Sequence, residues 1–155
     1  MRLRPEPPTY RQRVTDATVP IPTGRTHHLA RRDEWEAQRR APAYRPGAFT
    51  DEGFVHCTDG LDRLLVPANT YYRTDPGPFV VLEIDLDRVT APVRYDADPA
   101  IYPHVYGPIE RSAVVATYVP ERSDDGHFTG FGPAQAFQPD RPEGDSVDPG
   151  PGQRA

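Results

Sequence analysis

The sequence contains no lysine, because all eighteen basic residues are arginine, and twenty-three acidic residues leave a net charge of −5. This balance does not predict a broad electrostatic attraction to nucleic acid. No apolar run reaches the roughly 18 residues of a transmembrane helix, and the N-terminus lacks the apolar stretch of a signal peptide. The single cysteine, Cys57, excludes an internal disulfide. We therefore expect a cytoplasmic protein without a membrane partner.

Apolar residues are scarce, at 36% of the sequence with a mean hydropathy of −0.71, whereas proline occurs twenty times. A chain of 155 residues has room for one domain. The composition predicts an extended Pro-rich arm at 1–24, the domain at 25–120 and a Gly/Pro-rich tail at 121–155. Within the tail, two aromatics between glycines at 127–132 predict either a flap over a cleft or a local hydrophobic tether. The oligomeric state stays open.

Local patterns predict an α+β fold with two short helices. The spacing of Asp33 and Glu36 is that of a capping box, which predicts a helix running to about Arg40 with Trp35 as its anchor in the core. A second helix is expected to begin at Pro67, because proline is tolerated only in the first turn. Strand-favouring residues predict strands at 53–58, 79–86, 93–95 at a sheet edge, 104–106 and 113–119.

The chemistry-bearing residues are histidines that lie in or beside these predicted strands. A sheet could bring His28, His56 and His104 into one cleft, where imidazoles serve as acids, bases or hydrogen-bond donors near neutral pH. Strand alternation places Cys57 on the opposite face from His56, so the two do not form a nucleophile pair. Cys57 is therefore interpreted as a buried, inert thiol in preference to a catalytic thiolate.

Two further features bear on the cleft. No two histidines have the local spacing of metal ligands on a strand or a helix, so no metal site is predicted. Gly107 and Pro108 fix a bend that would hold His104 and Tyr106 at a strand edge facing a common pocket. The alternative interpretation of this bend is a β-bulge.

Ordered motifs between Thr26 and Pro120 resemble the bacterial domain-of-unknown-function family numbered 952 (DUF952). These motifs are His28-Leu29 with Trp35, Gly53-Phe54-Val55-His56-Cys57-Thr58, Ala68-Asn69, Leu82-Glu83-Ile84-Asp85 and His104-Val105-Tyr106-Gly107-Pro108-Ile109. The family is grouped by fold with the ADP-ribosyltransferases. The resemblance implies a small split, mainly antiparallel sheet that clamps NAD.

The resemblance also implies roles for individual residues. His28 is similar to a histidine that contacts the nicotinamide-side ribose. The strand at 53–58 and the helix after it resemble the second wall of the nicotinamide pocket, and the binding residues expected there are Phe54, Thr58, Asn69 and Tyr72. The segment 102–106 has no acid where many of these transferases carry a catalytic glutamate, and His27 replaces the usual aromatic before His28. The pattern is more like the RNA 2′-phosphotransferase branch.

Three functional hypotheses remain open. The first is an enzyme using NAD or a related nucleotide for ribosyl- or phosphoryl-type transfer or hydrolysis, with His56, His104 and Tyr106 at the reacting centre. The second is a cofactor-free cyclase, isomerase or hydrolase of bacterial secondary metabolism that uses His56 and His104 for proton transfer. The third is a binding module without chemistry.

Overall fold

The computed structural model describes residues 24–139. Apart from Gly24, the predicted arm lies outside these residues, as does the end of the predicted tail at 140–155. Within the described part of the chain, none of the helices has the length and apolar character needed to cross a membrane. The fold is a small α+β structure with antiparallel strand pairs, as the sequence predicts.

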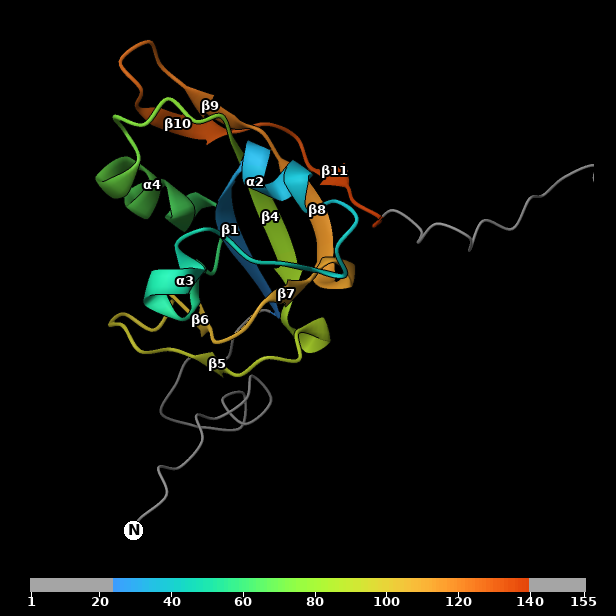
Figure 1. Ribbon diagram of the computed structural model, residues 1–155. Coiled ribbons are helices and arrows are strands. Elements are labelled where there is room, and N and C mark those ends of the chain that lie inside the picture. The colour runs from blue at the N-terminus through green and yellow to red at the C-terminus, as the bar shows by residue number, and fades with distance from the viewer. Residues whose placement is uncertain (1–23, 140–155) are drawn as a thin grey trace, which may run out of the picture.

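The largest sheet runs through the middle of the molecule (Figure 1). It consists of β1 (Arg25–Arg31), β4 (Phe79–Asp85), β8 (Val114–Tyr118) and β11 (Gln135–Ala136), in the order β1-β4-β8-β11 with every pair antiparallel. The predicted strand at 79–86 is confirmed as the central β4. Its alternate residues Val80, Leu82 and Ile84 are buried in the main core, as the period of two requires.

A second sheet lies below the first in Figure 1. It contains β3 (Val55–His56), β6 (His104–Val105) and β5 (Val93–Arg94) in the order β3-β6-β5, so β5 is at an edge as predicted. An isolated bridge joins the two sheets, with the His27 amide donating to Thr58 O at 2.9 Å and the Thr58 amide to His27 O at 2.8 Å. No ladder continues between β1 and β3 beyond this bridge in residues 24–139, so the strands part at His28.

Two smaller pairs complete the strands. β2 (Ala43–Tyr44) pairs with β7 (Ile109–Glu110), and β9 (Pro120–Arg122) pairs with β10 (Phe128–Phe131). The β2–β7 pair places Tyr44 in the core beside Trp35, with ring centroids 5.3 Å apart. Trp35 is buried, which confirms its predicted role as an anchor.

The first helix differs from its prediction at both ends. α2 (Arg32–Ala37) begins one residue before Asp33 and stops before Arg40. Arg31 is the N-cap and makes no side-chain capping bond, and within the described residues the Asp33 carboxylate accepts only from the adjacent Glu34 amide. The predicted capping box is therefore wrong, because the chain enters the helix directly from β1 and leaves no free cap position at Asp33.

The boundaries of the other helices also differ from the predictions. α4 (Leu65–Tyr71) begins two residues before Pro67 and follows the 3₁₀ turn η1 (Asp62–Leu64). Pro67 still lies in the first turn, where its missing N–H costs nothing. α3 (Phe49–Glu52) was not predicted, and it ends at Gly53, whose φ of 78° is left-handed. Because Gly53 closes this helix, the predicted strand at 53–58 shrinks to β3. Two more 3₁₀ turns are η2 (Leu86–Arg88) and η3 (Arg111–Ala113).

The chain after Pro120 departs from the expected tail. Residues 120–136 form β9, β10 and β11, and β11 extends the main sheet beside β8. Phe128 is buried against Ala68 of α4 and Phe79 of β4, which corresponds to the hydrophobic tether and not to a flap. The glycines that suggested a tail serve a tight hairpin: Gly126 has a φ of 87°, and a Cβ there would lie 2.2 Å from the Arg73 carbonyl oxygen.

Candidate functional site

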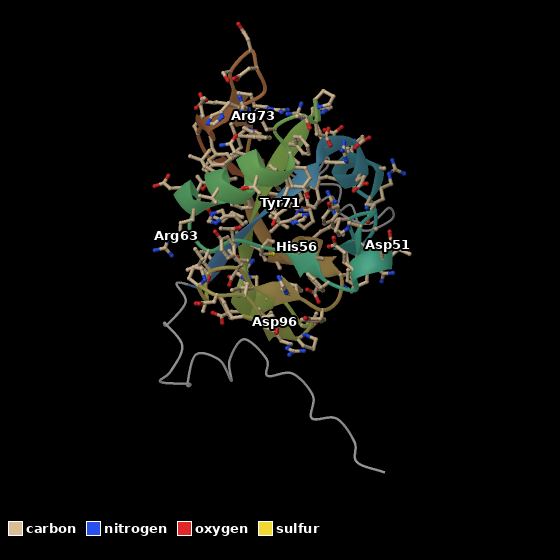
Figure 2. The ribbon with its side chains drawn as sticks, turned by 90° about the vertical axis from the view of Figure 1, so that its left-hand side faces the viewer. Asp51, His56, Arg63, Tyr71, Arg73 and Asp96 are labelled. Carbon is tan, nitrogen blue, oxygen red and sulfur yellow. The ribbon has the colours of Figure 1, made fainter. Side chains whose placement is uncertain are left out.

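A cavity of about 700 Å³ opens where β1 and β3 part. It lies between these strands, α3 and α4, and several of the predicted site residues line it: His28, Phe54, His56, Thr58, Tyr72 and His104. Figure 2 looks onto this side of the molecule, with His56 near the centre, Tyr71 of α4 above it and Asp96 below it. The structure therefore brings the predicted histidines to one cavity.

His56 and His104 face each other across the β3–β6 ladder. They are directly paired in the antiparallel register, and their ring centroids are 5.1 Å apart with the planes at 81°. Phe54 stacks on His104 at 4.1 Å and meets the edge of His56 at 4.8 Å. The two imidazoles are therefore held close together by a shared aromatic neighbour.

Each of these imidazoles has a carboxylate partner that sequence reasoning missed. His56 Nε2 lies 2.7 Å from Glu52 Oε2, and His104 Nδ1 lies 3.2 Å from Asp96 Oδ2. Asp96 also accepts from the Tyr106 hydroxyl at 2.5 Å and pairs with Arg94 Nε at 3.0 Å. The left-handed Gly53 reverses the chain between Glu52 and His56, so the end of a helix meets the strand that follows it.

The protonation of His104 follows from its surroundings. Burial lowers the pKa of His104, while the hydrogen bond and charge of Asp96 oppose that shift, and the net pKa lies below the ordinary value. His104 is therefore mainly neutral at pH 7. Because Asp96 accepts the proton on Nδ1, Nε2 keeps its lone pair and is the nitrogen left for a ligand. For Asp96 itself, burial opposes ionisation, but hydrogen bonds from Tyr106 and His104 lower its pKa overall.

His28 of β1 is buried and connects β1 to β3 through its side chain. Its Nδ1 donates to the His56 carbonyl oxygen at 2.7 Å, and its Nε2 lies 3.5 Å from the Tyr44 hydroxyl. Burial lowers the pKa of His28 to about 4, so the ring is neutral at pH 7. Nε2 is then a hydrogen-bond acceptor at the cavity wall.

Cys57 also lines the cavity, and burial together with the charge of Asp59 raises the pKa of its thiol. It is therefore a thiol at neutral pH, which supports the interpretation as an inert residue. Among residues 24–139, no group of three or more histidine, cysteine or acidic side chains is arranged to hold a metal ion.

Two predicted site residues lie outside the cavity wall. Asn69 donates from Nδ2 to the Phe128 carbonyl at 3.0 Å and accepts from the Phe128 amide at 2.7 Å, so it ties α4 to β10. Tyr106 does not line the cavity, and its hydroxyl supports Asp96. Tyr106 therefore acts on His104 through their shared partner Asp96.

The cavity wall also contains residues that sequence reasoning did not select. Besides Glu52, the main ones are Glu34 from α2, Tyr44 from β2 and Tyr71 from α4. A local signal existed only for Glu52, which stands four residues before His56 at the end of a short helix. The others reach the cavity through contacts between distant segments, which no local pattern reveals.

Comparison with known proteins agrees with this architecture of a small α+β fold with antiparallel sheets. The crystal structure of protein CC0527 from Caulobacter crescentus is similar at a TM-score of 0.59 and 18% identity, covering 68% of this chain and 93% of that one. The solution NMR structure of the same protein is similar at a TM-score of 0.52. The family described as "Protein of unknown function (DUF952)" matches residues 29–117, and the chain belongs to this family. No curated protein matches it.

Proposed function

We propose that the chain is a small-molecule enzyme whose His56 and His104 carry out acid–base chemistry in the cavity. The observation that carries this proposal is the pair of imidazoles 5.1 Å apart, each held by a carboxylate, at the wall of a 700 Å³ cavity. A catalytic base needs a fixed tautomer and a pKa near or below the working pH. His104 meets both requirements, so we assign it as the base and His56, 5.1 Å away, as a second group for proton transfer.

The cavity favours the form of this enzyme that works without a nucleotide cofactor. Of the cavity-lining residues, all within the described chain, only Arg31 carries a guanidinium, and it is paired with the Asp75 carboxylate. Glu34 and Glu52 add negative charge to the wall. A pyrophosphate usually binds to arginine or to helix N-termini, so these residues fit one poorly. The proposed reaction is therefore a cyclisation, isomerisation or hydrolysis of a small metabolite.

The elimination of 5-nitrobenzisoxazole tests the base directly. In this reaction the base takes the carbon-bound proton, the nitrile forms as the N–O bond breaks, and the coloured phenolate is released. We expect catalysis by the wild type and a loss of roughly a hundredfold in His104→Gln. The rate should rise with pH through a midpoint below 6.5, the ordinary histidine value, because the pKa of His104 is lowered.

His127→Gln is the matched control, because His127 is exposed and lies outside this cavity. It should keep the wild-type rate. Equal rates in His104→Gln and His127→Gln would contradict the assignment of the base.

A second candidate function is the use of NAD or a related nucleotide. The observation that favours it is His28, a neutral histidine where β1 and β3 part. Its Nε2 has a long contact of 3.5 Å with the Tyr44 hydroxyl, which a ribose hydroxyl would replace as the donor. Calorimetric titration with NAD, repeated with His28→Ala and His56→Ala, tests it. Binding that is lost in both variants supports a nucleotide site. An absence of binding at millimolar NAD removes this candidate. If the protein neither binds NAD nor catalyses the elimination, the third hypothesis is left, a binding module without chemistry.

A further inference from the structure

The negative charge in the cavity wall is only partly compensated. Glu52 meets His56, and Arg31 is occupied by Asp75. The carboxylate of Glu34 accepts from the Gly47 amide at 3.1 Å, and no ion pair involves Glu34 within residues 24–139. Glu34 is half-buried, so its charge is only partly screened by water. One carboxylate at the cavity is therefore left without a cationic partner.

The charge of Glu34 acts on two neighbouring tyrosines. Burial raises the pKa of Tyr44, and the negative charge of Glu34 raises it further. Burial also raises the pKa of Tyr72, and the charges of Glu52 and Glu34 raise it further, whereas the charge of Arg31 opposes this shift. The same charges that disfavour a tyrosinate favour a cation in the adjacent space.

Aromatic rings form much of the remaining wall. They include Tyr44, Phe54, Tyr71, Tyr72 and Tyr102. Of these, Tyr71 is 74% exposed and stands above His56 in Figure 2. The faces of aromatic rings attract cations, and this attraction is stronger at the half-buried Phe54 and Tyr102 than at the exposed Tyr71, where water competes. Aromatic walls and a carboxylate without a cationic partner together favour a positively charged ligand.

We propose that the cavity selects an organic cation, a small molecule with an amine or a charged nitrogen heterocycle, whose positive group lies against Glu34 and the surrounding rings. This inference rests on the proposed function in taking the bound molecule as the substrate. A half-buried carboxylate that loses hydration without gaining a cationic partner is stabilised by a bound cation, which offsets that loss. The reacting part of the molecule would then lie toward His56 and His104.

The test compares three probes of similar size by NMR titration of the full chain: benzylammonium, benzyl alcohol and benzoate. The wild type should bind benzylammonium most tightly, benzyl alcohol less tightly and benzoate most weakly. In Glu34→Gln, the affinity for benzylammonium should fall by about tenfold, because an opposite charge nearby is worth about one pKa unit or more. The affinity for benzyl alcohol should stay within about twofold, since its binding involves no charge.

The variants separate charge from structure. Glutamine at position 34 retains an acceptor for the Gly47 amide, so a purely structural role for Glu34 predicts no change in selectivity. Glu36→Gln on the exposed side of α2 is the matched control and should match the wild type. If Glu34→Gln does not fold, raising the salt concentration with the wild type must weaken binding of benzylammonium but not of benzyl alcohol.

Failure of this proposal is distinguishable from failure of the proposed function. Equal binding of the three probes, unchanged selectivity in Glu34→Gln, or no binding of benzylammonium would overturn the cation site and leave the elimination assay unaffected. Conversely, selective binding of benzylammonium by a protein that does not catalyse the elimination would refute the proposed enzyme activity and support the cation site.

Discussion

The buried, neutral His28 should make stability depend on pH in a way that one substitution removes. Its pKa is about 4 in the folded protein, whereas an unfolded histidine has a pKa of about 6.5. Between these values the unfolded chain binds more protons than the folded one, so the free energy of unfolding rises with pH. The contribution of His28 is therefore fully present above pH 6.5 and is lost progressively as the pH falls toward 4.

The magnitude follows from the two pKa values. Each pKa unit corresponds to about 1.4 kcal/mol, so lowering the pH from about 7 to about 5 should cost the wild type roughly 2 kcal/mol through His28 alone. His28→Gln has no titrating group at this position, and its amide can still donate toward the His56 carbonyl oxygen that Nδ1 now contacts. The variant should therefore lose roughly 2 kcal/mol less than the wild type over the same interval.

Urea denaturation at the two pH values measures this difference. Other titrating groups, including His104 and Asp59, are present in both proteins and cancel in the comparison. His127→Gln, an exposed histidine, serves as the control and should follow the wild type. If the wild type and His28→Gln lose the same free energy on acidification, then His28 is not buried as a neutral ring, and the account of this part of the cavity fails.

Two further predictions concern residues around the cavity. Asn69→Ala should lower the free energy of unfolding by about 1–3 kcal/mol, because it leaves the backbone amide and carbonyl of Phe128 without their partners. Urea denaturation measures this against Thr70→Ala, a change at an exposed position of the same helix, and equal losses would contradict it. Asp96→Asn should move the NMR titration of His104 to lower pH, because Asp96 opposes the effect of burial. An unchanged or raised midpoint would contradict the role of Asp96 as the partner of His104.

The long strand and the anchor of the core were predictable from the sequence because they depend on local patterns. Alternating apolar residues identify the strand at 79–86, and a lone tryptophan in a polar chain must find an apolar partner. Helix boundaries were less predictable. Asp33 and Glu36 have the spacing of a capping box, but β1 continues directly into α2, whose N-cap is Arg31. The segment after Pro120 was predicted as a tail from its glycines, but these glycines allow a tight hairpin between strands.

The sequence by itself determined which side chains were available for chemistry: His28, His56 and His104 on strand-like segments and a single cysteine. The tertiary structure alone decided that His56 lies opposite His104, that Asp96 accepts from His104 Nδ1, and that Glu34 reaches the cavity. β3 and β6 have two residues each, too few for a periodic signal, so only their pairing register sets which side chains meet. The protonation states follow from burial, which arises from packing between segments distant in the chain.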